Sequence, residues 1–154
     1  MKVLVLSDSH GAVHFLRRIL ETETEAEIVF FLGDGLGDIE EVKPSFPEKK
    51  FICVKGNNDF YYQENREAYK YIDGVTIMAC HGDAFGVRST LRELINKTAS
   101  VRGNLALYGH THQRNLYSDA ATGIFAVNPG AVCEGQYCVL DIEKGMFEYY
   151  PKTV

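Results

Sequence analysis

The chain has 154 residues, 45% of them hydrophobic, so it is long enough to bury the core of one domain, and we expect a single domain over residues 1–154. Its 16 Lys and Arg residues are dispersed and outnumbered by 21 Asp and Glu residues, which argues against a long nucleic-acid footprint. No apolar stretch approaches the ~20 residues that span a bilayer, and no signal-peptide pattern is present. The four cysteines lack Cys-x-x-Cys spacing. We therefore expect a cytoplasmic protein with reduced, mostly buried cysteines.

The first half of the chain alternates short apolar runs with amphipathic segments. Four runs have the length of buried strands: Lys2–Leu6, Ile28–Leu32, Phe51–Val54 and Val75–Cys80. Two segments have the apolar spacing of helices: Ala12–Glu21 and Val87–Thr98. In the second of these, four apolar residues stand at i, i+4, i+7 and i+8: Val87, Leu91, Leu94 and Ile95. This half of the chain indicates parallel strands connected by helices.

The second half contains strands that follow one another without a helix between most of them. The candidates are Leu105–Tyr108, Ile124–Val127, Gln136–Ile142 and Met146–Tyr150, and Glu143-Lys144-Gly145 is typical of a hairpin turn. A parallel half followed by an antiparallel half implies two sheets packed face to face with helices outside. The segment Tyr61–Asn65 suits either a lid or an oligomer contact, such as a dimer interface, because exposed tyrosines are enriched at interfaces.

Polar residues follow five of these runs directly. The segments are Ser7-Asp8-Ser9-His10-Gly11, Gly33-Asp34-Gly35, Gly56-Asn57-Asn58-Asp59, His81-Gly82-Asp83 and Gly109-His110-Thr111-His112. Functional groups in open α/β sheets gather at the carboxyl ends of the strands, so we expect the five segments to converge. His110 and His112 stand two residues apart on an extended segment, which turns both imidazoles to the same side.

Seven side chains in these segments have the chemistry of metal ligands: Asp8, His10, Asp34, Asn57, His81, His110 and His112. Mixed nitrogen and oxygen donors suit Mn²⁺, Fe, Zn²⁺, Ni²⁺ or Co²⁺, whereas a closed structural zinc site more often uses Cys. Seven donors are too many for one tetrahedral ion with an open position, yet they fit two ions if one carboxylate bridges them. Two-metal sites clamp the attacking and leaving oxygens of an in-line displacement at phosphorus.

The same blocks, in the same order, occur in the calcineurin-like metallophosphoesterases, and the chain resembles that family over nearly its whole length. The short length and the Asn128-Pro129-Gly130 segment make it similar to the small YfcE-type phosphodiesterases of bacteria and archaea. The resemblance implies an α/β (α+β) fold, a four-layer sandwich of two mixed β-sheets flanked by helices. It also implies a phosphodiesterase that acts on a small phosphate ester.

The resemblance further implies two sets of ligands that share Asp34 as the bridging carboxylate. The first ion would be held by Asp8, His10, Asp34 and His112, and the second by Asp34, Asn57, His81 and His110. A hydroxide between the ions would attack phosphorus in line, since the metals lower the pKa of bound water. Mn²⁺ is the ion that we expect, with Ni²⁺, Co²⁺, Zn²⁺ or Fe as alternatives.

One position departs from the pattern of the larger relatives, which read Gly-Asn-His with that His near the leaving group. Here the residue is Asn58, which can bond a phosphate oxygen but cannot act as a general acid, a role worth about 10²–10⁴-fold. Asn58 is our candidate for substrate contact and catalysis, with Asp59 as the residue that orients it.

Arg114 is a further candidate for contact with the phosphate. His14, Asp38 and Asp83, near the same blocks, are interpreted as surface, turn or cap residues.

Two other functions stay open. A metal-dependent nuclease is one, although the acidic chain and the lack of a nucleic-acid-binding extension argue against it. A protein-binding scaffold is the other, because a fold relative in the retromer coat acts as one. A scaffold predicts eroded ligand positions, whereas every ligand position is present here. We expect a small phosphate ester as the partner, with no membrane.

Overall fold

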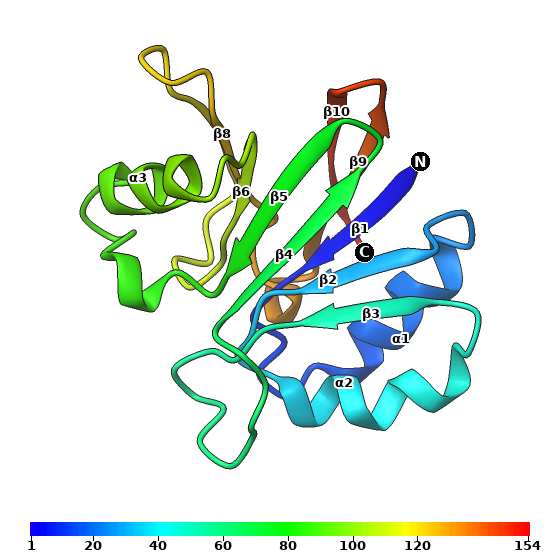
Figure 1. Cartoon of the computed structure of the whole chain (residues 1–154). Coiled ribbons are helices and arrows are strands. Elements are labelled where there is room, and N and C mark those ends of the chain that lie inside the picture. Colours follow the sequence, from blue (N-terminus) through cyan, green and yellow to red (C-terminus); the bar gives the residue numbers. More distant parts are fainter.

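Two five-stranded sheets face each other in the computed structural model, which describes residues 1–154 (Figure 1). The first sheet has the order β10-β9-β1-β2-β3, with β1 (Lys2–Leu6), β2 (Ile28–Phe31), β3 (Lys50–Cys53), β9 (Gln136–Glu143) and β10 (Met146–Thr153). The second has the order β4-β5-β6-β8-β7, with β4 (Glu67–Ile72), β5 (Val75–Cys80), β6 (Leu105–Leu107), β7 (Asn115–Ser118) and β8 (Phe125–Asn128).

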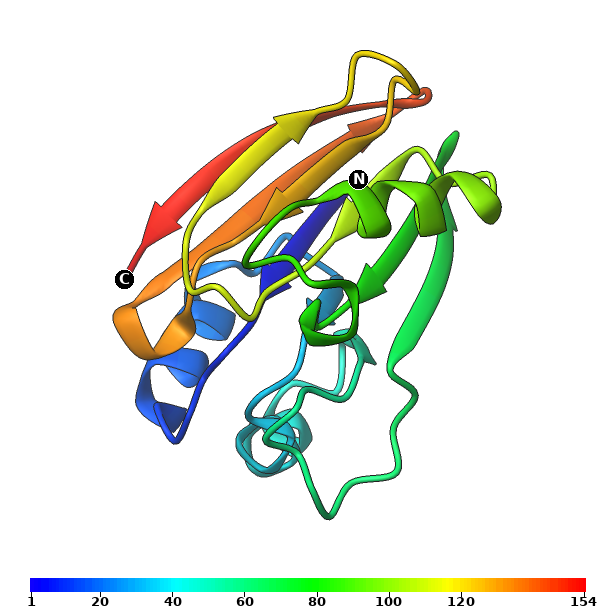
Figure 2. The same ribbon diagram turned by 90° about the vertical axis from the view of Figure 1, so that its left-hand side faces the viewer.

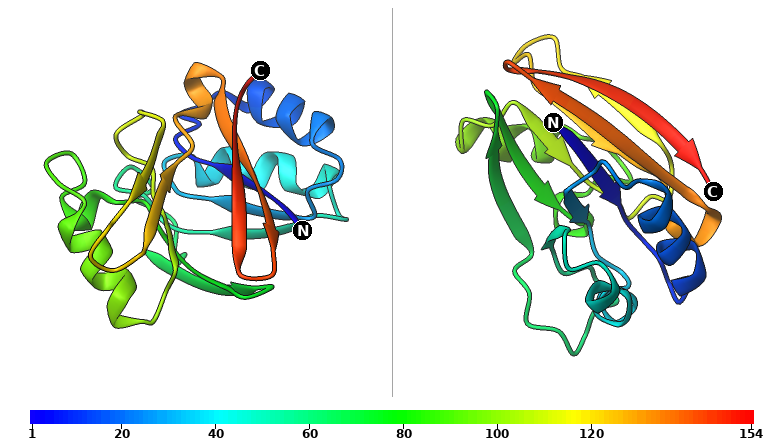
Figure 3. Two further views of the ribbon diagram at one scale, coloured as in Figure 1. Left: turned by 90° about the horizontal axis from the view of Figure 1, so that it is seen from above. Right: turned by 90° about the vertical axis from the view of Figure 1, so that its right-hand side faces the viewer.

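Three helices complete the layers. Figures 2 and 3 show α1 (Val13–Thr22) and α2 (Leu36–Val42) together on one side of the sheets and α3 (Arg92–Ser100) on the other. Single turns of 3₁₀ helix lie at Lys43–Ser45, Asp83–Phe85 and Val132–Glu134. The four-layer α/β sandwich of two mixed sheets that the resemblance implies is confirmed. No helix in the structure combines the length and the apolarity that a membrane span requires.

The apolar residues of β1 explain why this strand lies at the centre. Val3 and Val5 pack into the core between the two sheets, and Leu4 and Leu6 pack beneath α1 and α2. A strand that is buried on both faces needs a continuous apolar run, which is the pattern that predicted it. A third core cluster, which includes Met78 and Leu94, lies between α3 and the second sheet.

The expected division into a parallel half and an antiparallel half is wrong. Each sheet has three parallel strands, β1-β2-β3 in the first and β5-β6-β8 in the second, and each has antiparallel strands beside them. The reason is that β9 returns to the first sheet and pairs with β1, so that Leu140 lies opposite Val3. The parallel strands of each sheet therefore end beside one another, and their loops supply the site.

Helix α1 lies within one residue of its predicted bounds, but the predicted helix over Val87–Thr98 is wrong in its first half. Gly86 has a left-handed φ of 60°, and a turn follows it before α3 begins at Arg92. Val87 is buried because it packs in the cluster below α3, so its apolar spacing reflects packing rather than helix. The sequence analysis also missed α2, β4 and β7.

The segment Tyr61–Asn65 lies in the loop between β3 and β4. Tyr61 is 95% exposed, whereas Tyr62 packs against the core beneath α2. The alternatives of a lid and a dimer contact stay predictions, now restricted to the outer side chains of this loop.

Candidate metal centre

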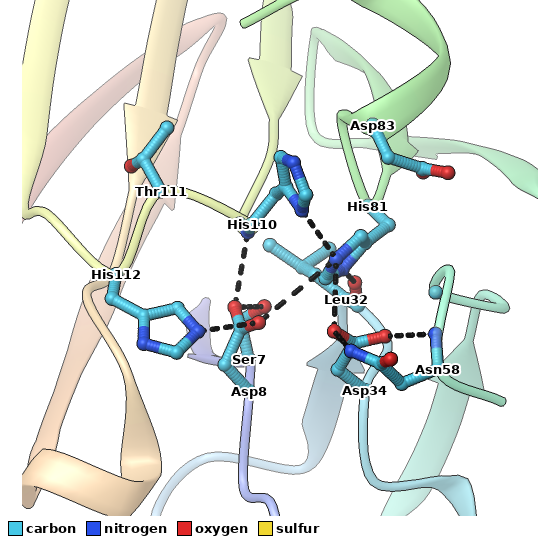
Figure 4. Close-up of polar contacts among 12 residues, drawn as sticks. Ser7, Asp8, Leu32, Asp34, Asn58, His81, Asp83, His110, Thr111 and His112 are labelled. Atoms are coloured by element: carbon cyan, nitrogen blue, oxygen red, sulfur yellow. Dashed lines mark hydrogen bonds and ion pairs between the residues drawn. The ribbon is translucent and has the colours of Figure 1, made fainter. Parts of the chain in front are cut away.

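Five loops at the carboxyl ends of β1, β2, β3, β5 and β6 meet at one edge of the molecule. Figure 4 shows the side chains of Asp8, Asp34, His81, His110 and His112 lying close together. The first three follow the ends of β1, β2 and β5, and the last two share the loop after β6. The first sheet supplies the two carboxylates and the second supplies these three imidazoles. The structure therefore brings these five candidate ligands together from both sheets.

Asp8 is buried at the centre of the cluster. Its Oδ2 accepts hydrogen bonds from Ser7 Oγ at 2.6 Å and from the His110 amide at 3.0 Å. Its Oδ1 is buried without a hydrogen-bond partner, and three imidazole Nε2 atoms surround it at 3.2, 3.5 and 3.9 Å, those of His112, His10 and His81. Buried polar atoms are rarely left unpaired, and a carboxylate oxygen among imidazole nitrogens suits a cation. The residues present thus fit a divalent metal.

Asp34 reaches both sides of the cluster. Its Oδ2 lies 3.4 Å from His81 Nε2 and 3.7 Å from His10 Nε2. Asn58 donates two hydrogen bonds to the same carboxylate. Its backbone N–H donates to Oδ1 at 2.8 Å, and its side-chain Nδ2 donates to Oδ2 at 2.7 Å. Asp34 thus lies near His10 of one expected ligand set and His81 of the other, as Asp8 also does, and the bridging role of Asp34 stays a prediction. Potential ligand atoms form two groups, Asp8-His10-His112 and Asp8-Asp34-His81.

His81 is oriented by the backbone of the neighbouring strand. Its Nδ1 lies 2.7 Å from the Leu32 carbonyl oxygen, so Nδ1 carries the proton and Nε2 faces the two carboxylates. Burial alone lowers the pKa of His81, but the hydrogen bond to Asp34 and the charge of Asp8 raise it above its usual value. Burial raises the pKa of Asp34, but hydrogen bonds with His81 and Asn58 reverse this and bring it well below its usual range.

The four imidazoles form two pairs. The rings of His10 and His112 lie 5.2 Å apart, and those of His81 and His110 lie 5.1 Å apart. His110 Nδ1 is 3.2 Å from His81 Nε2, and His110 Nε2 accepts a hydrogen bond from Arg88 Nε at 3.0 Å. Burial and the nearby charges of His81 and Arg88 lower the pKa of His110. Each pair consists of the two imidazoles that the sequence analysis assigned to the same ion.

The backbone of the cluster is strained. Five of the eight non-glycine residues with positive φ are expected ligands: Asp8, His10, Asp34, His110 and His112. Residues of this kind cost free energy and persist where the surrounding structure enforces them, often at functional sites. Gly109 and Gly56 permit the close packing, because a Cβ at Gly109 would collide with Ser7 and one at Gly56 with Asp34.

Three other candidates occupy different positions. Asn57 is exposed in the turn after β3. Asp59 is buried, and its carboxylate accepts hydrogen bonds from four backbone amides, those of Asp34, Gly35, Leu36 and Gly56. These bonds fix the loop of Asp34 rather than the side chain of Asn58. Arg114 is not part of the cluster, because its guanidinium donates to the Lys152 carbonyl and to Thr153 Oγ1 on β10.

The sequence analysis missed three residues that support these loops. Asp38, which was interpreted as a turn or cap residue, accepts hydrogen bonds from Ser9 Oγ at 2.6 Å and the Gly11 amide at 2.8 Å, and so braces the His10 loop. Asn128 Nδ2 donates to the Gly109 carbonyl and to Thr111 Oγ1, both at 3.0 Å. Arg88 contacts His110. Only Asn128 had a signal, the Asn-Pro-Gly segment.

Solved structures share this fold. A conserved uncharacterized protein from Streptococcus pneumoniae TIGR4, a predicted phosphoesterase, has a TM-score of 0.82 at 22% identity over 99% of this chain and 88% of that one. A novel archaeal phosphodiesterase has a TM-score of 0.74 at 23% identity over 99% and 100%. Vps29 of Entamoeba histolytica complexed with Zn²⁺ has a TM-score of 0.80 at 19% identity over 99% and 92%. These likenesses concern the fold.

Sequence comparison is more specific. The chain is 28% identical over 132 residues to "Probable metallophosphoesterase YsnB" of Bacillus subtilis (strain 168), which covers 86% of this chain and 75% of that protein. A family model, the calcineurin-like phosphoesterase superfamily domain, matches residues 1–145, which include every expected ligand. The chain therefore belongs to the calcineurin-like phosphoesterase superfamily.

Proposed function

We propose that this metal-dependent phosphoesterase is a phosphodiesterase with a centre for two divalent ions. The observation that supports it most strongly is Asp8 Oδ1, a buried carboxylate oxygen that has no hydrogen-bond partner and three imidazole nitrogens around it. Hydrogen bonding within the protein leaves this oxygen unsatisfied, and a cation would satisfy it.

The ligand sets are those expected from the family pattern. Asp8, His10, Asp34 and His112 would hold one ion, and Asp34, Asn57, His81 and His110 the other. When bound, the two ions would supply an activated water at neutral pH and a positive charge that stabilises the phosphoryl oxygens. We propose Mn²⁺ as the ion, with Ni²⁺, Co²⁺, Zn²⁺ or Fe able to replace it, because mixed nitrogen and oxygen donors suit all of them.

The remaining residues orient and bind. Leu32 sets the tautomer of His81 through its carbonyl, and the amide of His110 holds Asp8. Asn58 donates one Nδ2 hydrogen to Asp34, and it would donate the other to a phosphate oxygen and supply no proton to the leaving group. An enzyme without a general acid at this position favours esters with good leaving groups, such as aryl diesters.

The first test is hydrolysis of bis(p-nitrophenyl) phosphate by metal-stripped protein with Mn²⁺, Ni²⁺, Co²⁺, Zn²⁺ or Mg²⁺ added back. We expect activity that needs metal and that falls at least about 100-fold in Asp34→Asn, since the bridging carboxylate is lost. Glu143→Gln is the control, because it removes one negative charge from an exposed position at the end of β9, and it should leave the rate unchanged.

The same assay separates the alternatives. A nuclease would cleave long DNA faster than the small diester. A scaffold would bind ions without hydrolysing any ester, so an inactive protein that takes up two ions would overturn the phosphodiesterase proposal. We favour the enzyme because both carboxylates and all four imidazoles are present and lie close together.

A further inference from the structure

A pocket of about 500 Å³ opens beside the double-histidine loop. Its polar lining comes from the turn before α3 and from the loop between β6 and β7, and includes Arg88, Ser89, Thr90, Thr111, Gln113 and Arg114. Thr111 stands between His110 and His112, and Arg88 bonds to His110, so the pocket adjoins the metal centre. A substituent on a phosphate bound at that centre would extend into it.

The charge of the pocket is opposite to that of the chain. The chain has a net charge of −5, whereas two arginines and no carboxylate line the pocket. Asp83, the acidic residue after β5, pairs with Arg66 and is not part of the lining. Hydroxyl and amide groups add hydrogen-bond donors. Such a site favours an anionic group over an apolar one.

The two arginines differ in how firmly they are held. Arg114 is anchored to β10 by two hydrogen bonds. Arg88 is exposed, and its side chain bonds only to His110, through Nε to His110 Nε2 at 3.0 Å and through Nη2 to the His110 carbonyl at 3.4 Å. Arg88 is therefore the cation that can turn toward a ligand.

The bond between Arg88 and His110 conflicts with a loaded metal centre. His110 Nδ1 faces His81 Nε2, which lies near the carboxylates of Asp8 and Asp34, so Nδ1 is the nitrogen that an ion would use. A neutral imidazole that offers the lone pair of Nδ1 carries its proton on Nε2. Nε2 is then a donor and cannot accept from Arg88 Nε–H. A loaded centre thus removes the bond from Arg88 Nε and leaves only the longer bond of 3.4 Å from Nη2 to the His110 carbonyl, so the guanidinium is held less firmly beside the pocket.

We propose that Arg88 binds a second anionic group, a carboxylate or a phosphate, on the substituent of the ester that occupies this pocket. This inference rests on the proposed function and names its substrate class: phosphodiesters with a charged rather than an apolar substituent. Arg114 contributes positive charge from the pocket wall without moving.

Calorimetry on the Mn²⁺-loaded protein tests the pocket directly. The probes are phenylphosphonate and 4-carboxyphenylphosphonate, which differ by one carboxylate. We expect the wild type to bind the second probe roughly fivefold to tenfold more tightly, Arg88→Met to lose this preference, and Arg88→Lys to keep part of it. Arg18→Met removes the same charge from an exposed position on α1 and should keep all of it. Equal binding of the two probes by the wild type, or a preference that survives in Arg88→Met, would overturn the inference.

Metal affinity gives a second readout, on which Arg88→Met should have a favourable rather than an unfavourable effect. Titration of metal-free protein with Mn²⁺ should show affinity about threefold or more tighter in Arg88→Met, because no bond to His110 must break and a nearby positive charge is gone. Unchanged or weaker Mn²⁺ affinity would overturn the inference that metal binding breaks the bond between Arg88 Nε and His110 Nε2. If the probes are distinguished but no ester is hydrolysed, the proposed function fails and the pocket stands. Hydrolysis without any preference between the probes would overturn the pocket alone.

Discussion

Asp59 acts on the site through the backbone. Its buried carboxylate accepts four amide N–H groups, and one of them belongs to Asp34. In Asp59→Asn the side-chain NH₂ group would face backbone N–H donors instead of accepting from them. We therefore expect the free energy of unfolding to fall by about 2–3 kcal/mol. Urea denaturation measures this, with Asp119→Asn as the control. Asp119 accepts from Thr122 in an exposed loop, and its loss should cost at most about 1 kcal/mol. Equal costs would contradict a specific role for Asp59.

Asn58 bears on the choice of leaving group. Asn58→His restores the residue of the larger relatives, so a proton donor becomes available and alkyl diesters should gain at least about tenfold relative to aryl diesters. Steady-state rates on a matched aryl and alkyl pair measure the ratio, and Mn²⁺ titration checks that ion binding survives the change. A ratio that stays the same in a folded, metal-binding variant would show that Asn58 does not limit proton transfer.

At the scale of the elements, the strands and short helices determine the behaviour of the four free cysteines. Burial raises the pKa of Cys53 in β3 to about 12, and raises that of Cys138 in β9 as well. A raised pKa leaves less of the reactive thiolate at a given pH, so both thiols should resist alkylation at pH 8. Cys133, in the short helix before β9, is half-buried like Cys53, but burial raises its pKa less, so it should react first. Peptide mapping after reaction with iodoacetamide checks this order of reactivity. Unfolding in urea should remove the differences between the thiols.

How well the sequence predicted each element depended on where its signal lay. Strands β1, β2, β5 and β6 are buried on both faces, so their apolar runs were sufficient. Strand β7 is exposed throughout, and α2 has only seven residues, so neither gave a clear pattern. The clustering of the candidate ligands could be predicted because each follows a strand end. Asp38 was not, because its partners lie 27 and 29 residues away and only the fold brings them together.

At the scale of the whole molecule, the centre connects the two sheets. The first sheet ends in Asp8, His10, Asp34 and Asn57, and the second ends in His81, His110 and His112. Ligand bonds from both sides would join the sheets at one edge, next to the buried core between them. An ion that binds only the folded chain stabilises it by about 2.7 kcal/mol at a concentration 100 times its dissociation constant. Metal affinity and fold stability are therefore linked here.

This linkage predicts how stability depends on pH. Without metal, His81 has a raised pKa, so its paired, protonated form stabilises the fold at low pH and this contribution is lost as the pH rises through that pKa. Metal binding needs neutral imidazoles and has the opposite dependence. Mn²⁺ should therefore raise the melting temperature strongly at pH 8 and little at pH 5.5, where protons compete, and excess Mn²⁺ should recover part of the shift and part of the activity. Calorimetric scans with and without chelator measure it, and Asp34→Asn should remove most of the shift. A shift of equal size at both pH values would mean that the ions do not replace protons on the histidines.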